Sequence, residues 1–79
     1  MHIRVLFFGL TADIVGLREM GFDLPNASNS ETIIKRVIAT FPRLASHQLL
    51  FSVNQQYATG EETLLEGDEI AIFTAVSGG

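Results

Sequence analysis

The sequence predicts a single α+β domain, in which one main helix packs on one face of a small mixed sheet. Three observations lead to this class. The chain has 79 residues, which is room for one domain with one modest core. Apolar, β-branched runs near both ends of the chain have the character of strands. Between them lies one segment whose apolar residues repeat with the period of a helix.

The first predicted strand covers residues 3–8, "IRVLFF", which are β-branched, aromatic or aliphatic apart from one arginine. Alternation divides them into two sets, one for each face of the sheet: Ile3, Val5 and Phe7, and then Arg4, Leu6 and Phe8. The stretch "TADIVG" then predicts a short helical turn, with Thr11 as its cap and Gly16 as its end. A second strand follows in "REMGFDLP"; Pro25 ends it, and Gly21 is a candidate bulge.

The segment "NASNSETIIKRVIATFP" predicts the main helix. Two N-caps are equally good, namely Ser28, which would form a capping box with Glu31, and Ser30. One apolar stripe at helical period marks the face that packs on the core: Ile33, Ile34, Val37, Ile38 and Phe41. Pro42 disfavours helical conformation in the residue before it and so ends the helix.

Three further strands are predicted after the helix. Residues 49–54, "LLFSVN", form the third strand, "QYAT" a short fourth strand at an edge, and a last strand begins at Glu69 after the tight turn "EGDE". With the helix as a long crossover, the first and last strands can lie side by side and parallel in the middle. This is the plan of the ubiquitin-like β-grasp fold, and we expect one domain over residues 1–79 with 74–79 as a flexible C-terminal tail.

Apolar residues are more abundant than a small core needs, at 47% of the chain, which suggests a sticky outer face. If Ile70 and Ile72 lie under the helix, Phe73 points to the opposite face, as Phe8 does on the neighbouring first strand. An aromatic pair on an open sheet face is typical of a protein interface. The alternative is that one or both rings fill gaps at the rim of the core.

Charge and composition exclude several classes of function. The net charge is −4 and the five basic residues are scattered, which argues against nucleic acid and anionic membranes as partners. No apolar stretch approaches the roughly 20 residues that span a bilayer, and the N-terminus lacks the pattern of a signal peptide. We therefore expect a cytoplasmic protein. The absence of cysteine excludes disulfides, thiolate nucleophiles and Cys-ligated metals.

The side chains show no constellation typical of a self-sufficient enzyme. His2 and His47 are far apart and lack ligand spacing, so no metal site is predicted. The acidic residues gather in two groups beside turns: Glu61 and Glu62, and Glu66, Asp68 and Glu69. At turns they should be solvated, which fits an acidic face for a basic partner better than an active site. The two glycines of "GLTADIVG" do not have the spacing of a phosphate-binding loop.

The sequence ends on Gly78 and Gly79, directly after the apolar last strand. Glycine lets backbone approach a partner closely, and an extended tail of residues 74–79 reaches about 20 Å. Such a tail could thread a narrow channel and present its carboxylate in another protein. There the carboxylate can be activated as a mixed anhydride with AMP, and it can then receive sulfur as a thiocarboxylate or form an amide with a lysine. This chemistry needs no side chain from the carrier.

Four stretches carry a resemblance to a known family: "VLFFG", "ADIVG", "VNQQYA" and "LLEGDEIAIFTAVSGG". They closely resemble the small subunit of molybdopterin synthase, the MoaD-like sulfur carriers. The likeness runs from the first strand to the last residue, although between Asn26 and His47 it holds only in pattern. The resemblance implies a sulfur carrier that is not catalytic alone and binds no cofactor itself.

By the same resemblance, Gly79 is adenylated by an ATP-using, ubiquitin-activating-type adenylyltransferase and converted to a thiocarboxylate. The carrier then gives its sulfur to a pterin precursor in the large subunit of molybdopterin synthase, within a heterotetramer. The product is the molybdopterin dithiolene, which later holds molybdenum. The residues of the inserted tail are implied to be Val76, Ser77 and Gly78. Those of the partner interface are implied to be Phe8, Tyr57 and Phe73.

One departure from the family pattern concerns the start of the tail. Thr74 and Ala75 stand where the family usually has two prolines, which would hold the tail extended. We expect a looser tail here, with an effect on partner specificity rather than on the carboxylate. Two other functions stay open at this point. One is a thiamine-type or other metabolic sulfur carrier, and the other is a non-covalent β-grasp adaptor whose tail is incidental.

Overall fold

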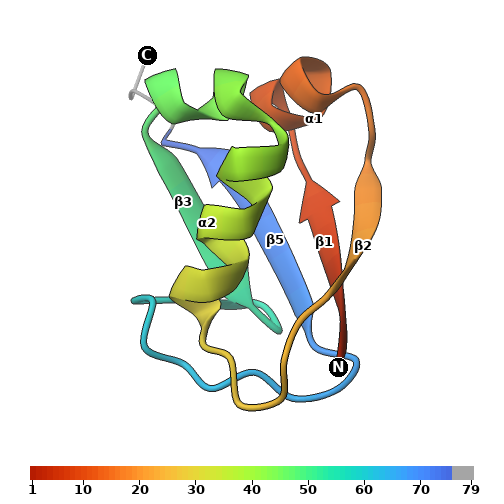
Figure 1. The fold of residues 1–79 in the computed structure, drawn as a ribbon. Helices are drawn as coiled ribbons and strands as arrows, with labels where there is room; N and C mark the ends of the chain where they lie inside the picture. Colours follow the sequence, from red (N-terminus) through yellow and green to blue (C-terminus); the bar gives the residue numbers. More distant parts are fainter. Residues whose placement is uncertain (76–79) are drawn as a thin grey trace.

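The computed structural model describes residues 1–75, and within them a five-stranded sheet is covered on one face by α2 (Ser30–Thr40), as Figure 1 shows. The strands are β1 (His2–Phe7), β2 (Glu19–Asp23), β3 (Leu49–Val53), β4 (Gln56–Tyr57) and β5 (Glu69–Thr74). Their order in the sheet is β2-β1-β5-β3-β4, with β1 and β5 parallel and every other pair antiparallel. The predicted mixed sheet with parallel central strands is confirmed, and so is the short β4 at an edge.

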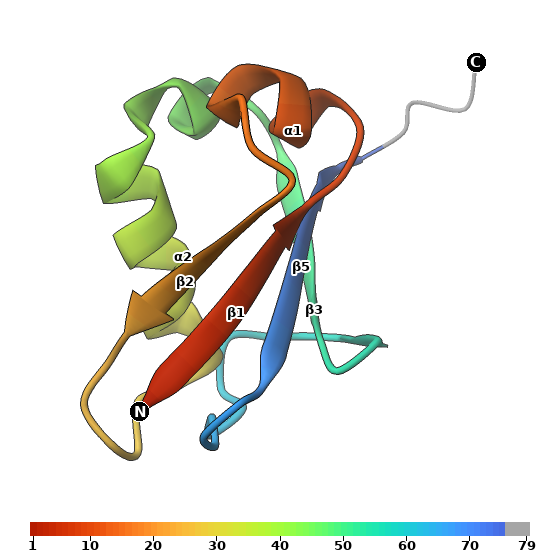
Figure 2. The same ribbon diagram turned by 90° about the vertical axis from the view of Figure 1, so that its right-hand side faces the viewer.

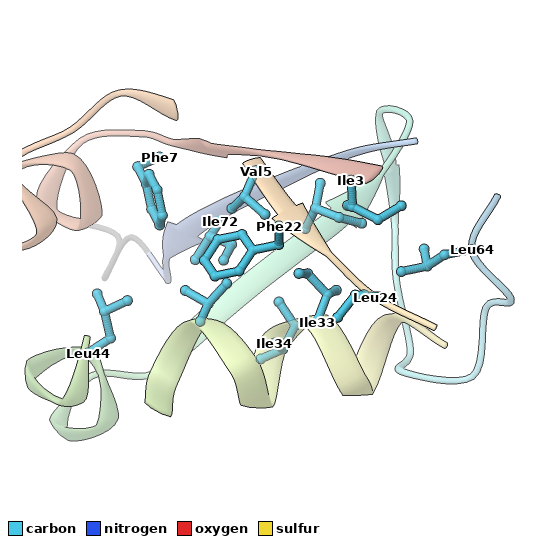
Figure 3. Packing of buried hydrophobic residues seen from close by; sticks show 12 residues of the cluster. Ile3, Val5, Phe7, Phe22, Leu24, Ile33, Ile34, Leu44, Leu64 and Ile72 are labelled. Carbon is cyan, nitrogen blue, oxygen red and sulfur yellow. The ribbon is translucent and has the colours of Figure 1, made fainter. Parts of the chain in front are cut away.

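The central strands bury one face each, as their alternation predicts. Val5 lies beside Ile70 and Phe7 beside Ile72 in the parallel ladder, and all four side chains are buried. Figure 3 shows these side chains and those of α2 pointing toward one another from opposite sides of the core. Burying each large apolar side chain contributes roughly 1.5–3 kcal/mol. The packing of α2 on β1 and β5 is therefore a main source of stabilisation.

The core extends beyond the predicted helix stripe to connecting segments. Ile33, Ile34 and Val37 of α2 are buried, as predicted, and Ile38 and Phe41 pack partly buried against them. Three residues outside the long elements complete the core: Leu24, directly after β2, Leu44, from the short 3₁₀-helix η1 (Pro42–Ser46), and Leu64, from the segment before β5. Leu44 and Leu64 lie at opposite ends of this core and close the two ends of the space between α2 and the sheet (Figure 3).

The start of α2 differs from both predicted caps. Asn29 is the N-cap, and its Oδ1 accepts a hydrogen bond from the Thr32 N–H at 3.0 Å. The Ser28 hydroxyl instead donates to the Pro25 carbonyl, and Ser30 is a buried residue inside the helix. Asparagine caps a helix as well as serine does. The backbone bridge between Asn29 and Thr63 decides among them, because it holds Asn29 in the extended conformation that a cap needs.

The short helix α1 (Leu10–Val15) begins earlier than predicted. Its N-cap is Gly9, so the prediction of Thr11 as the cap is wrong. Thr11 lies inside the helix with its side chain fully buried, where its hydroxyl bonds the ends of β1 and β5. Gly16 ends the helix in the left-handed conformation with φ 80°, as predicted.

Gly21 is not a bulge, because it pairs with Arg4 in a regular antiparallel register. A Cβ built at this position would lie 2.5 Å from Cε1 of His2, closer than real contacts allow. The imidazole of His2 therefore lies across the glycine on the open face of the sheet. This close approach explains why β2 has a residue without a side chain there.

The last strand reaches further than predicted. Thr74 still belongs to β5, opposite Leu49, and the N–H of Ala75 donates to the Gln48 carbonyl at 3.2 Å. The prediction that the tail begins at residue 74 is therefore wrong by at least one residue. None of the helices within residues 1–75 has the length and apolar character that crossing a bilayer requires.

Candidate functional site

The face of the sheet opposite α2 is divided into a charged half and an apolar half. Figure 2 shows α2 along one side of the sheet only. Strand register places the outward residues of the other side in two groups. The charged half lies at the amino ends of β1 and β5 and consists of His2, Arg4, Asp23 and Glu69, together with Glu19, which is paired with Leu6 but lies 3.6 Å from Arg4. The other half is mostly apolar. Its apolar residues, which we call the apolar patch, are Leu6, Phe8, Leu50, Tyr57, Ala71 and Phe73, and Ser52 lies among them, opposite Tyr57 and Ala71.

Phe73 lies at the centre of the apolar patch. It is half-buried, faces away from the core and is paired across the ladder with Leu50. Its ring contacts that of Tyr57, with centroids 5.9 Å apart and planes at 61°. The expected face of Phe73 is confirmed, but its aromatic partner is Tyr57 rather than Phe8. An edge-to-face contact of this kind contributes about 0.5–1.5 kcal/mol, and it favours this position of the Tyr57 ring, although Tyr57 is 77% exposed.

Phe8 completes the aromatic set one residue beyond the end of β1. Its N–H donates to the Ile72 carbonyl at 3.1 Å, so it continues the ladder beside Phe73. Its side chain is 51% exposed and does not belong to the core cluster. The alternative that Phe8 and Phe73 fill gaps in the core is therefore wrong. The structure brings the three predicted interface residues, Phe8, Tyr57 and Phe73, onto one face.

The apolar patch lies beside the C-terminal end of β5. β5 ends at Thr74, directly after Phe73. The predicted tail residues Val76, Ser77, Gly78 and Gly79 lie outside the described residues, so their roles stay predictions. The described part of the site is therefore an exposed apolar surface beside the end of β5.

A shallow hollow of about 530 Å³ borders the apolar patch on its α1 side. Its lining shares two residues with the patch and comes from β1, α1 and the start of β2: Leu6, Phe7, Phe8, Gly9, Ala12, Asp13, Arg18 and Glu19. It contains no histidine, cysteine or hydroxyl group. The hollow therefore combines an apolar side, shared with the apolar patch, with the charged side chains of Asp13, Arg18 and Glu19.

The charged half of the open face is paired within itself. The guanidinium of Arg4 bonds the Glu69 carboxylate on β5 and lies 3.6 Å from Glu19 Oε2 on β2. His2 Nδ1 lies 3.0 Å from Asp23 Oδ1, and this hydrogen bond lowers the pKa of Asp23. Exposed pairs of this kind contribute little stability each. Their charges are thus matched with one another on this half of the face.

Glu62 is a structural carboxylate rather than a solvated one. Its Oε1 accepts hydrogen bonds from the Ser30 hydroxyl at 2.7 Å and from the Gly60 N–H at 3.1 Å. Its Oε2 accepts from the N–H of Thr59 at 2.9 Å. These bonds, led by that of the Ser30 hydroxyl and followed by that of the Thr59 N–H, lower the pKa of Glu62 to about 2. The prediction of a solvated side chain is wrong here.

Asp68 and Glu69 are also half-buried and bonded within the chain. Asp68 accepts hydrogen bonds from the N–H of Leu65 at 2.8 Å and from the amide of Asn54 at 3.0 Å, which closes the turn before β5. Glu69 binds Arg4. Only Glu61 and Glu66 of the predicted acidic groups are exposed. The five predicted acidic residues therefore do not form one exposed acidic face.

Both histidines are exposed, as predicted for surface residues. Within residues 1–75, no three His, Cys, Asp or Glu side chains are grouped so that they could hold a metal ion.

Sequence reasoning missed part of the apolar patch and the bonds that support it. Leu50 could have been found from the alternation in "LLFSV", since it falls on the face opposite Phe51. The bonds of Glu62 and Thr11 join segments far apart in the chain, 32 residues in the pair Ser30–Glu62 and 61 in the pair Thr11–Ile72. No local pattern marks such partners.

Comparison with known proteins identifies relatives over the whole chain. The model of the ThiS family matches residues 5–79. The chain is 35% identical over 83 residues to the molybdopterin synthase sulfur carrier subunit of Chlamydomonas reinhardtii, with 100% of both chains covered. It is 33% identical to the subunit of the same name in Homo sapiens, with 99% of this chain and 94% of the human one covered.

Solved structures support the fold. SAMP1 from Haloferax volcanii superimposes with a TM-score of 0.89 at 22% identity, and 100% of each chain is covered. A putative molybdopterin converting factor, subunit 1, from Pyrococcus furiosus superimposes with a TM-score of 0.89 at 19% identity, with 96% of this chain and 99% of that chain covered. These likenesses confirm the predicted ubiquitin-like β-grasp architecture. The chain belongs to the ThiS family, and its relatives at 33% and 35% identity are molybdopterin synthase sulfur carrier subunits.

Proposed function

We propose that this protein is the sulfur carrier subunit of a molybdopterin synthase, with the carboxylate of Gly79 as the group that carries sulfur. The observation that supports it most is the family match, which runs through residue 79 and so includes the Gly-Gly sequence. The apolar patch beside the end of β5 adds a second support, because a carrier needs a surface by which to dock while its tail reaches an active site.

The chemistry begins at the Gly79 carboxylate. One carboxylate oxygen attacks the α-phosphorus of ATP on the activating adenylyltransferase, and pyrophosphate leaves. Sulfide, as HS⁻, then attacks the carbonyl carbon of the acyl adenylate, and AMP leaves, which produces a thiocarboxylate. In the synthase, the thiocarboxylate sulfur attacks a carbon of the pterin precursor, and a carbon–oxygen bond at that carbon breaks as the oxygen leaves with a proton. Water then cleaves the bond between the carbonyl carbon and sulfur, which leaves sulfur on the pterin and returns the carboxylate.

In these steps the carrier places the C-terminal carboxylate or thiocarboxylate of Gly79 in the active site of each partner. The catalytic side chains belong to the activating enzyme and to the large synthase subunit. The apolar patch buries its aromatic side chains, Phe8, Tyr57 and Phe73, against the large subunit, and aromatic residues dominate the energy of such interfaces. A solved complex of subunits 1 and 2 of molybdopterin-converting factor from Helicobacter pylori contains a chain of this fold, with a TM-score of 0.69 at 18% identity. We propose a heterotetramer of two carriers on a dimer of large subunits.

No observation favours the two alternatives. The relatives at 33% and 35% identity carry the name of the molybdopterin pathway rather than that of thiamine synthesis. A non-covalent adaptor would give no reason for the family match to continue through the final glycine.

Intact mass spectrometry tests the proposal directly. The purified chain is incubated with ATP, a sulfur source and the activating enzyme of its host. The expected result is a mass gain equal to one oxygen-to-sulfur exchange, confined to the C-terminal peptide. An unchanged mass contradicts the proposal, provided that the same enzyme preparation is active on another carrier. Supply of sulfur to a pterin precursor by the large synthase subunit then identifies the pathway.

Deletion of Gly79 separates the carrier from the adaptor. The shortened chain should keep its fold and its affinity for the large subunit within a few fold, because the apolar patch is intact. It should accept no sulfur, because the carboxylate is then one residue short of the activating site. If the deletion variant is still converted to a thiocarboxylate, Gly79 is not the reacting residue.

A further inference from the structure

Thr11 carries a hydroxyl group that joins three elements at the base of the apolar patch. Its side chain is fully buried within α1. Its Oγ1 accepts a hydrogen bond from the Phe8 N–H at 3.0 Å. Its single proton faces two carbonyl oxygens, that of Phe8 at 2.7 Å and that of Ile72 at 2.8 Å. One hydroxyl therefore ties α1 to the end of β1 and to β5.

The backbone between Phe8 and α1 turns sharply at Gly9. This residue has φ 55° and ψ −127°, a conformation that side-chain-bearing residues avoid. A Cβ there would meet nothing within 4 Å, so the backbone angles alone require glycine. The Phe8 backbone is therefore restrained in two ways: by the turn at Gly9 that follows it, and by the hydrogen bonds of its N–H and carbonyl groups to the Thr11 hydroxyl. The Phe8 ring is thus displayed to solvent on a backbone with little freedom.

The same hydroxyl acts on the last strand. Ile72 directly precedes Phe73, and Thr74, the final residue of β5, follows next. A hydrogen bond to the Ile72 carbonyl therefore holds the strand next to its outward ring and close to the root of the tail. Rings held in their bound arrangement lose less conformational entropy on association.

We propose that Thr11 is a positioning residue, which sets the arrangement of Phe8, Phe73 and the end of β5 for the large synthase subunit. This rests on the proposed function, since it names the device that prepares the docking surface. Thr11 itself touches neither the sulfur nor the partner.

The substitution Thr11→Val isolates the hydroxyl from the shape of the side chain. Valine has the same branched outline, so the buried space stays filled. The backbone groups also keep partners, because the Phe8 N–H still reaches the Ile72 carbonyl at 3.1 Å and the Thr11 N–H still reaches the Phe8 carbonyl at 3.2 Å. The variant should therefore fold. It loses the hydrogen bonds by which the Thr11 hydroxyl joins α1 to Phe8, after β1, and to Ile72 of β5.

Two readouts test the proposal, and the first needs no sulfur chemistry. In the free Thr11→Val chain, the amide of Phe8 should exchange hydrogen roughly tenfold faster than in the wild type, while amides in the middle of α2 are unchanged. In the second, the affinity of the large subunit should fall about tenfold, because rings that are no longer held in place lose more conformational entropy on binding. Thr11→Ser keeps the hydroxyl and should restore both values.

Val37→Ala serves as the matched control, because Val37 is fully buried on α2 and does not belong to the apolar patch. It should lower the melting temperature without changing the affinity, when both are measured well below unfolding. Unchanged Phe8 exchange or unchanged affinity in Thr11→Val overturns the proposal. So does an equal loss of affinity in Val37→Ala, which would assign the effect to stability alone. A wild-type chain that accepts no sulfur contradicts the proposed function, and the exchange measurement still decides the role of Thr11.

Discussion

Phe7 and Phe8 are adjacent in the chain and have opposite roles. Phe7 is 3% exposed and packs edge-on against Phe41, with ring centroids 5.9 Å apart. Phe8 is 51% exposed on the other face, where it belongs to the apolar patch. The alternation of the strand alone separates them. Phe8 lies outside the core and beside Phe73 of β5. Two neighbouring aromatic side chains on an exposed sheet face are the evidence that single residues give for a docking surface.

At this scale we predict the effect of Phe73→Ala on the complex with the large subunit. Removing the ring should weaken binding by about 1 kcal/mol or more, which is about fivefold or more, because it is a central aromatic residue of the apolar patch. The fold should survive, since Phe73 is outside the core cluster. Isothermal titration calorimetry measures the affinity, and circular dichroism monitors the fold.

Leu17→Ala provides the control for Phe73→Ala. Leu17 is 46% exposed and apolar, but it lies outside the apolar patch, so its removal should leave the affinity unchanged. Severe unfolding of Phe73→Ala would instead assign Phe73 to the core. Equal effects of the two substitutions would show that the loss of any exposed apolar side chain weakens the complex.

At the scale of elements, the loop 59–62 completes the N-terminus of α2. The N–H of Ser30 donates to the Glu62 carbonyl at 2.8 Å, and the N–H of Glu31 donates to the Gly60 carbonyl at 3.0 Å. The first N–H groups of a helix have no partners within the helix itself. This loop supplies them, and the Glu62 side chain fixes the loop by bonding its backbone and Ser30. The helix and the loop should therefore unfold together.

The lowered pKa of Glu62 predicts how stability depends on pH. Because the folded state holds the carboxylate ionised, this group stabilises the fold above its ordinary pKa of 4.5, and the contribution is lost as the pH falls toward about 2. Glu62→Gln should therefore be less stable than the wild type at neutral pH, and its stability should change less between pH 4.5 and 2. Urea unfolding at several pH values in this window measures the difference.

Glu61→Gln is the matched control for this substitution, since Glu61 is the exposed neighbour of Glu62. It should keep the pH dependence of the wild type. If Glu62→Gln shows the wild-type slope as well, the loop does not depend on the ionised carboxylate.

At the scale of the whole molecule, one core connects every described element except the exposed edge strand β4. Ile72 is fully buried in β5 between β1 and β3, under the helix layer. We predict that Ile72→Ala lowers the free energy of unfolding by about 2–5 kcal/mol, because it leaves a cavity that the core can close only in part. This is a large share of the roughly 5–15 kcal/mol that stabilises a domain. Chemical denaturation followed by circular dichroism measures it, and a loss well below 1 kcal/mol would contradict a single shared core.

The elements and their order could be read from the sequence because the signals are local. Alternation in "IRVLFF" and "EIAIF", the period of the α2 stripe and the proline after it each depend on neighbours a few residues apart. The N-cap of α2 was missed because Ser28, Asn29 and Ser30 are equally suitable by type. Only the bridge from Asn29 to Thr63, 34 residues later, distinguishes them.

The candidate site divides in the same way. That Phe8 and Phe73 face away from the core follows from strand alternation, and the Gly-Gly sequence, to which we assign the chemistry in our proposal, is visible in the chain itself. The tertiary structure decided that Phe73 contacts Tyr57, that Glu62 is bonded to Ser30 and that Thr11 joins β1 to β5. The physical reason is distance along the chain. Sequence patterns report forces between near neighbours, whereas these contacts exist only after the sheet and α2 bring remote segments together.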